Sequence, residues 1–134
     1  SVGGDCTSFI SQCIYAGSKI MNYSKQNGWY YINGYNKSPS WSGVKFLYQF
    51  LTTNKSIGPF GRLSEKEEIE IGDIVQLSFD GINFAHSLII TSINSNFDLD
   101  NIKIASHTLD NFNKPISSYN FQDIRFIHIE GIRR

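Results

Sequence analysis

The 134-residue sequence has no excess of charge of either sign. Twelve Lys and Arg residues balance twelve Asp and Glu residues, so the formal net charge at pH 7 is zero. A chain without net positive charge lacks the broad electrostatic attraction that draws proteins to nucleic acid or to anionic membrane surfaces. We therefore expect neither nucleic acid nor a membrane surface as its partner.

Long apolar runs are also absent. No stretch approaches the roughly 20 residues needed to cross a bilayer. The chain opens on Ser1-Val2-Gly3-Gly4 without the basic stretch and apolar segment of a signal peptide. Its length suits one domain with one sizeable core. We expect residues 1–134 to form a single domain, excised from a longer protein whose upstream residues are missing.

Cysteine is scarce, and the two that occur are Cys6 and Cys13. No CxxC pair exists, which argues against a structural zinc site. On one helix, residues seven apart have Cα atoms about 10 Å from each other, beyond the limit of about 7 Å for a disulfide. We expect two thiols that are not bonded to each other, no metal and no organic cofactor.

The first half of the chain has helical patterns. Apolar positions 6, 9, 10, 13 and 14 share one helical face and predict a buried helix over 6–16, with Asp5 as its N-cap and Gly17 after its end. A long aromatic-rich loop follows over 18–39. A second helix is predicted from Ser40 or Ser42 to about Thr53, and residues 58–61 (GPFG) should then break the chain.

The second half has short strand-like runs. Strands are predicted over 73–79, 82–93, 102–107 and 124–130, with Asp80-Gly81 as a two-residue hairpin turn between the first two. Helices that precede an antiparallel sheet define an α+β domain, in which the helices must pack on the sheet to bury their apolar faces.

Cys6 lies in the first turn of the first predicted helix. Helix N-termini lower the pKa of cysteine thiols, and the thiolate is the nucleophilic form. The unpaired N–H groups of the same turn can bind an oxyanion. The alternative is that Cys6 is a small apolar residue at the start of a buried face, and mid-helix Cys13 fits that description better.

Three histidines could act as the base. His86 lies within a strand, where an imidazole is either part of the core or aimed at a partner. His107 ends the third strand, at a position from which it could orient a neighbouring imidazole. His128, in the last strand and without a motif around it, is interpreted as structural.

Three segments together resemble a known superfamily. They are Gly4-Asp5-Cys6-Thr7-Ser8-Phe9, Gly72-Asp73-Ile74-Val75 and Ala85-His86-Ser87-Leu88-Ile89-Ile90. Their order and spacing are similar to those of the NlpC-like and CHAP-like cysteine peptidases and amidases of bacterial cell walls. With Trp41 and the Ser106-His107-Thr108-Leu109-Asp110 segment included, the bacterial putative amidase domain family is the best match over nearly the whole chain. The resemblance implies a papain-like fold.

The resemblance also implies roles for residues. Cys6 becomes the nucleophile, His86 the general base and then acid, and His107 the residue that orients His86. Nearby loop residues could orient His86 instead: Asp110, Asn111 or Asn113. The candidate substrate-binding residues are Asp5, Trp29, Trp41 and Asp110, with core packing under the long loop as the alternative for the two tryptophans.

The implied reaction is hydrolysis of an amide bond through a thioester acyl-enzyme. The expected partner is a peptide or peptidoglycan-fragment substrate, and the expected location is secreted or associated with the bacterial cell envelope. Two alternatives stay open: an acyltransferase that uses the same residues, and a non-catalytic module that only binds in the groove.

Overall fold

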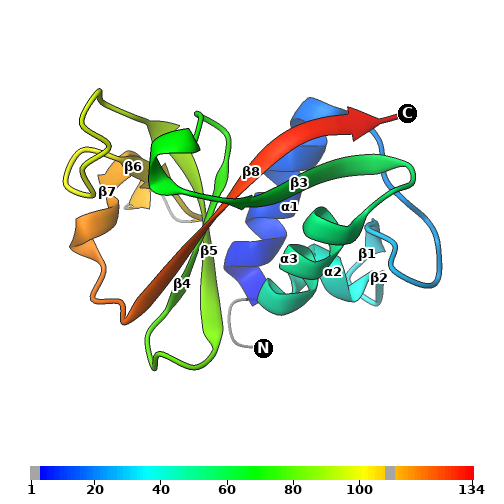
Figure 1. Ribbon diagram of the computed structural model, residues 1–134. Helices are drawn as coiled ribbons and strands as arrows, with labels where there is room; N and C mark the ends of the chain where they lie inside the picture. The colour runs from blue at the N-terminus through cyan, green and yellow to red at the C-terminus, as the bar shows by residue number, and fades with distance from the viewer. Residues whose placement is uncertain (1–3, 108–110) are drawn as a thin grey trace.

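The computed structural model describes residues 4–107 and 111–134, with three helices gathered on one side of a sheet (Figure 1). The helices are α1 (Gly4–Ser18), α2 (Pro39–Ser42) and α3 (Val44–Thr53). Short 3₁₀ turns at Lys66–Glu68 and Ile116–Ser118 lie in the strand-rich part of the chain.

A six-stranded antiparallel sheet forms the second layer, in the order β3-β8-β4-β5-β6-β7. Its strands in chain order are β3 (Gly58–Ser64), β4 (Ile74–Ser78), β5 (Phe84–Ser92), β6 (Lys103–Ala105), β7 (Lys114–Pro115) and β8 (Asp123–Arg133). Helices packed on an antiparallel sheet confirm the predicted α+β class.

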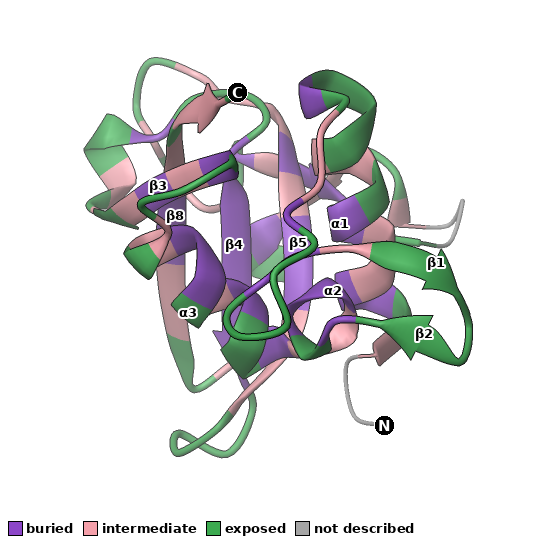
Figure 2. Ribbon diagram, turned by 90° about the vertical axis from the view of Figure 1, so that its right-hand side faces the viewer, coloured by how far each residue is buried: buried purple, intermediate pink, exposed green. Residues whose placement is uncertain are grey.

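The core consists of two hydrophobic clusters, one between the helices and the sheet and one formed by strands and their connections. The helix-side cluster joins the helices to the sheet through Ile74 of β4 and Ile127 of β8, with these helix and loop residues: Ile10, Trp29, Trp41, Leu47, Phe50 and Leu51. The next residue of β4, Val75, belongs to the other cluster together with Leu77 and Leu88. Successive strand residues point to opposite faces, so β4 contributes to both clusters and is buried throughout (Figure 2).

The first helix is longer than predicted and its buried face is turned. Asp5 lies inside the first helical turn, so it is not the N-cap, and Gly17 continues the helix, which ends at Ser18 before Lys19 takes a left-handed φ of 60°. Small polar side chains join the buried face: Thr7 and Ser11 are fully buried. Their hydroxyls find partners on other elements, which lets a polar residue occupy a core position.

The segment predicted as a loop and one helix has more structure. A small hairpin, β1 (Tyr31–Asn33) with β2 (Asn36–Lys37), stands out from the loop and is exposed (Figure 2). Gly43 adopts an extended conformation at φ −102° and ψ 124°, which divides the predicted helix into α2 and α3.

Two turn predictions were wrong. The segment that begins with Gly58 and Pro59 is a strand, because β3 is an edge of the sheet, where a proline without an N–H does not disrupt pairing. Gly61 makes this pairing possible, since a Cβ there would collide with the carbonyl of His128. Asp80-Gly81 is not a two-residue hairpin turn, because Ser78 pairs with Phe84 and the connection spans residues 79–83.

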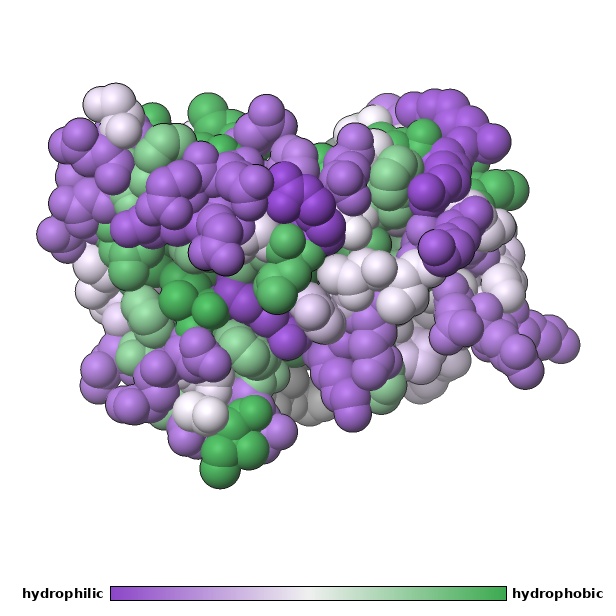
Figure 3. All heavy atoms as spheres, viewed as in Figure 1, coloured by the Kyte–Doolittle hydropathy of each residue, from purple (hydrophilic) through white to green (hydrophobic). Residues whose placement is uncertain are grey.

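The surface in the view of Figure 3 is mostly hydrophilic, with apolar residues interspersed in separate groups. The C-terminus returns to the helical layer, where Arg134 donates a hydrogen bond from Nη1 to the Ser18 carbonyl at 3.0 Å. None of the helices in the described residues combines the length and apolar character that a membrane span needs.

Candidate active site

The first turn of α1 and strand β5 bring a thiol and an imidazole into contact. Cys6 Sγ lies 2.9 Å from His86 Nδ1, although the two residues are 80 positions apart in the sequence. Cys6 is buried, with 5% of its surface exposed, and His86 is half-buried. Cys13, two turns further along α1, is bonded to neither, and burial raises the pKa of its thiol. The structure therefore selects Cys6 of the two cysteines as the one with a base beside it.

The surroundings of His86 favour its neutral form. Burial is the main cause that lowers the pKa of this imidazole, and electrostatic interactions with His107 and Lys114 lower it further. The ring packs between two aromatic side chains, with centroid distances of 6.3 Å to Phe79 and 5.5 Å to Tyr119. A neutral imidazole at hydrogen-bond distance from a thiol can accept its proton.

A buried hydrogen-bond chain joins the neighbours of these two residues. Thr7, which follows Cys6, has its Oγ1 3.0 Å from Oγ of Ser87, which follows His86. Gln76 on β4 donates from Nε2 to Ser87 Oγ at 3.2 Å and to the Val44 carbonyl at 3.0 Å. Thr7, Ser87 and Gln76 are fully buried. The chain therefore ties the start of α1 and the start of α3 to β4 and β5 at the level of the thiol.

Arg125 anchors the far end of this chain. Its Nε and Nη2 donate to Gln76 Oε1 at 2.9 and 2.6 Å. The guanidinium carbon lies 3.8 Å from the centre of the Tyr48 ring and 4.0 Å from that of Phe84, so the cation is held between two aromatic faces. Burial lowers the pKa of Arg125. This arrangement fixes the side-chain amide of Gln76 with its Nε2 toward Ser87.

The residues that the sequence offered for orienting His86 differ in their positions and partners. His107 is exposed after β6 and close enough for its charge to act on His86, but in the described part of the chain no hydrogen bond joins the two rings. The amide oxygens of Asn111 and Asn113 accept from Lys114 Nζ and Thr91 Oγ1, respectively. Asp110 lies outside the described residues. The role of His107 stays a prediction.

Of the candidate substrate-binding residues that the structure describes, Asp5 is next to the thiol, whereas the two tryptophans belong to the core. Asp5 is exposed in the first turn of α1, next to Cys6. Trp29 and Trp41 are 0% and 2% exposed, and their rings lie 4.9 Å apart in the helix-side cluster. Trp29 Nε1 donates to Ser11 Oγ at 3.1 Å. In this position the two indoles pack the core under the loop, which is the alternative that the sequence left open.

Asp73 of the Gly72-Asp73 segment has a structural task. Its Oδ2 accepts from the Glu70 N–H at 2.7 Å and lies 2.8 Å from His128 Nδ1, while its Oδ1 accepts from the Ile129 N–H at 2.9 Å. Gly72 has a φ of +95°, a conformation that favours glycine. These contacts join the start of β4 to β8. His128 thus has a structural partner, as its interpretation from the sequence expected.

Several residues near the site were missed from the sequence. Gln76 looked like an ordinary strand residue, although a polar residue inside an apolar run is a signal of buried hydrogen bonding. Tyr119 carried no motif, yet its ring covers His86. Burial raises the pKa of Tyr119, and the nearby Ser106 hydroxyl opposes that rise, although neither hydroxyl has a hydrogen-bond partner of good geometry among the described residues.

No metal ligand set was found in the described ranges, 4–107 and 111–134: no three His, Cys, Asp or Glu side chains cluster so that they could hold an ion. The chemistry available at the site is that of the thiol, the imidazole and the backbone N–H groups of the first turn of α1.

Comparison with known proteins shows the family of the chain. The structure is an α+β domain in which the Cys6 thiol, at the start of α1, contacts the His86 imidazole on β5. The chain belongs to the Putative amidase domain family, which it matches over residues 1–129.

One relative is the uncharacterized protein YhbB of Bacillus subtilis (strain 168). It is 30% identical over 91 residues, which cover 66% of this chain. The aligned part is 29% of the length of YhbB, so the chain corresponds to less than a third of that protein. No solved structure matches the fold significantly.

Proposed function

We propose that this domain is a cysteine-dependent amidase or peptidase, which hydrolyses an amide bond through a thioester acyl-enzyme. The observation that carries the proposal is the 2.9 Å contact between Cys6 Sγ and His86 Nδ1 in the first turn of α1. Membership of the Putative amidase domain family supports the same class of reaction. The relation to papain-like peptidases rests on the order of the Cys and His segments in the sequence.

In the first half of the reaction, His86 accepts the proton of Cys6 and the sulfur attacks the amide carbonyl carbon. Backbone N–H groups of the first turn of α1 have no partner within the helix and stabilise the oxyanion. His86 then protonates the leaving amine, the C–N bond breaks, and the acyl group stays on Cys6 as a thioester.

In the second half, His86 removes a proton from water, which attacks the thioester carbonyl. The C–S bond breaks, the carboxylic acid leaves, and Cys6 recovers its proton. Neither half transfers electrons. Each half needs a proton carrier, which is His86, and a site for the acyl group, which is the sulfur of Cys6. The lowered pKa of His86 supports its role, because the neutral base is the form that starts each half.

For the substrate, we propose peptides of the bacterial cell wall as the first class to test, and a secreted or envelope-associated location. Both follow from the resemblance to wall peptidases.

The decisive test is the rate of alkylation of Cys6 and Cys13 by iodoacetamide as a function of pH, followed by peptide mass spectrometry. We expect Cys6 to react well below pH 8, and Cys13 to react slowly because burial raises its pKa. His86→Gln should move the Cys6 profile toward that of an ordinary thiol, near pH 8.5. If wild-type Cys6 stays inert up to that pH, the proposal is wrong.

A substrate screen then separates the hydrolase from its two alternatives. Release of a free acid without amine capture supports hydrolysis, whereas products formed with an added amine indicate an acyltransferase. A peptide ligand that binds equally well to wild type and to Cys6→Ala, without turnover by wild type, indicates a binding module.

A further inference from the structure

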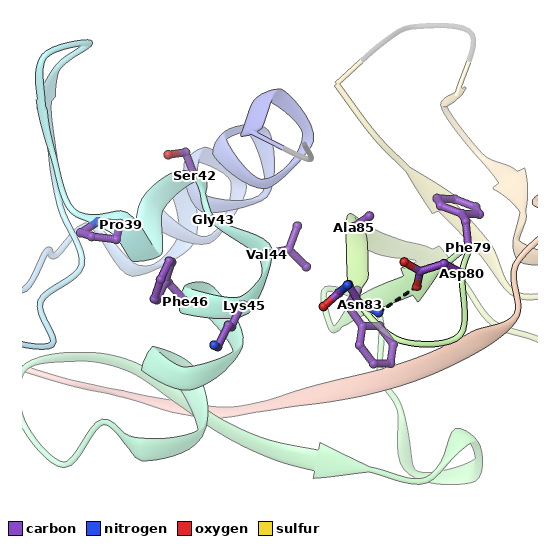
Figure 4. Close-up of a pocket in the computed structure, with 11 residues that line it drawn as sticks. Pro39, Ser42, Gly43, Val44, Lys45, Phe46, Phe79, Asp80, Asn83 and Ala85 are labelled. Carbon is purple, nitrogen blue, oxygen red and sulfur yellow. Dashed lines mark hydrogen bonds between the residues drawn. The ribbon is translucent and has the colours of Figure 1, made fainter. Parts of the chain in front are cut away.

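A cavity of about 730 Å³ opens between the helical layer and the β4–β5 connection (Figure 4). One wall comes from the α2–α3 junction, with Val44 and Phe46, and the other from the hairpin, with Phe79, Phe84 and Ala85. In Figure 4 Val44 faces Ala85 and Asn83 across the opening, with Phe46 next to Pro39 on the helical side and Phe79 beyond Ala85 on the hairpin side. The volume falls within the range of about 300–1,000 Å³ typical of ligand sites.

The walls of this cavity are mainly aromatic and aliphatic. Phe46 and Phe79 are 47% and 45% exposed, so large apolar surfaces meet water there. Two charges accompany them, Lys45 on the helical side and Asp80 on the hairpin. Backbone N–H groups of Asn83 and Ile82 hold the carboxylate of Asp80 and lower its pKa, so this charge is already bound. The cavity therefore offers a ligand mainly its apolar surface, with the ammonium group of Lys45 at one side.

The cavity adjoins the catalytic pair. Ala85 directly precedes His86 on β5, and the Phe79 ring lies 6.3 Å from the His86 ring. The backbone carbonyl of Val44, on the opposite wall, accepts a hydrogen bond from Gln76 Nε2. This bond belongs to the buried hydrogen-bond chain that includes Thr7, the residue after Cys6. Cys6 and His86 are not among the lining residues, so the cavity is linked to the pair through Phe79 and through the chain neighbour Ala85.

We propose that this cavity binds a large apolar side chain, aromatic or branched aliphatic, next to the amide bond that Cys6 attacks. The inference rests on the proposed amide hydrolysis. It names a substrate class that differs from common wall stem peptides, whose side chains are mostly small or charged. Small or charged side chains would leave the rings of Phe46 and Phe79 exposed to water, whereas an apolar side chain would cover them. The walls therefore select a peptide by the residue beside the scissile amide.

Two thiol reagents test this without a known substrate. N-phenethyl chloroacetamide and N-(2-hydroxyethyl) chloroacetamide have the same reactive carbon and differ in their apolar or polar arm. We expect Cys6 to react with the phenethyl reagent about tenfold faster, because its ring is removed from water in the cavity. The ratio of the two rates at Cys13, measured in the same digests, is the reference for a thiol that does not adjoin the cavity. Equal ratios for the two cysteines would overturn the proposal.

Phe46→Asp places a charge in the wall at a half-exposed position. For Cys6, the ratio of the phenethyl rate to the hydroxyethyl rate should then fall close to the ratio measured for Cys13. Ile57→Asp is the matched control, because Ile57 is 44% exposed and does not line the cavity, and its ratio should equal that of wild type. A Phe46→Asp ratio equal to wild type would contradict the assignment.

A competition experiment needs no variant. An excess of N-phenethylacetamide, which has no leaving group, should slow the phenethyl reagent at Cys6 in wild type and leave its reaction with Cys13 unchanged. No slowing at Cys6 would count against the proposal.

The reaction with iodoacetamide separates this inference from the proposed function. If Cys6 reacts with iodoacetamide below pH 8 in a His86-dependent way but shows no preference for the phenethyl arm, only the cavity assignment fails. If the His86-dependent reaction is itself absent, the proposed function fails.

Discussion

Thr7 and Ser87 share a buried hydrogen bond of 3.0 Å, and each directly follows one member of the Cys6–His86 pair. This hydrogen bond joins α1 to β5 directly beside the contact between the thiol and the imidazole. Gln76 then ties Ser87 to β4 and to the start of α3. The geometry of the pair depends on a polar chain that contains neither of the two reacting side chains.

Removal of one hydroxyl from this chain should loosen the pair. We expect Thr7→Val, which keeps the shape of the side chain, to cost about 1 kcal/mol of unfolding free energy. The rate of Cys6 alkylation at pH 7 should fall by between a few-fold and about 100-fold, because small misplacements of reacting groups have large effects. Ser87→Ala should act in the same direction.

The control for Thr7→Val is Thr52→Val. Thr52 Oγ1 also donates a partly buried hydrogen bond, to the Tyr48 carbonyl at 2.7 Å, but this bond lies within α3. This variant should leave the pH profile of Cys6 alkylation unchanged. A profile of Thr7→Val identical to that of Thr52→Val would show that the hydroxyl chain does not position the thiol.

The charge of Lys114 should affect the pH dependence of the reaction. Lys114 lowers the pKa of His86, so the neutral base persists to lower pH than an ordinary histidine would allow. In Lys114→Gln the pKa of His86 rises, and more of the imidazole is protonated at a given acidic pH. The acid limb of the Cys6 rate profile should therefore move to higher pH. Lys55→Gln, at an exposed position after α3, should leave the limb in place.

Asp73 should matter for stability. It is 3% exposed and its carboxylate accepts two backbone hydrogen bonds besides contacting His128. We expect Asp73→Ala to lower the free energy of unfolding by about 2–4 kcal/mol, because two partly buried N–H groups and His128 lose their partner. Urea titration followed by tryptophan fluorescence measures this. Asp100→Ala, on an exposed turn, should stay within about 0.5 kcal/mol of wild type.

Trp29 should also be a stability residue and not a substrate contact. Its indole is fully buried and stacks on Phe50 with a centroid distance of 5.9 Å. Trp29→Ala should cost about 3–5 kcal/mol, and Tyr35→Ala, at a fully exposed position, should cost little. A Trp29 variant with an unchanged melting temperature and lost turnover would instead place the indole in a substrate groove.

Local signals in the sequence were enough for much of the fold. Helical spacing located α1 and α3, and short strand-like runs bounded by turn residues located β4, β5 and β8 to within a few residues. Errors fell where tertiary pairing overrides local preference. Gly58 and Pro59 have turn propensity, yet the edge of the sheet accepts them as β3 because β8 supplies its hydrogen bonds. Asp5 is a good capping residue, yet the helix starts before it.

By itself, the sequence determined which groups could react: a cysteine at the start of a helix and a histidine within a strand, in an order that resembles that of amidases. Residue types and periodicity carry this information because they act over a few neighbouring positions. Only the tertiary structure decided that Cys6 and His86 meet at 2.9 Å, that Gln76 and Arg125 support them, and that the tryptophans belong to the core. These relationships join elements far apart in the chain, and they depend on how the helices pack on the sheet, which local patterns do not specify.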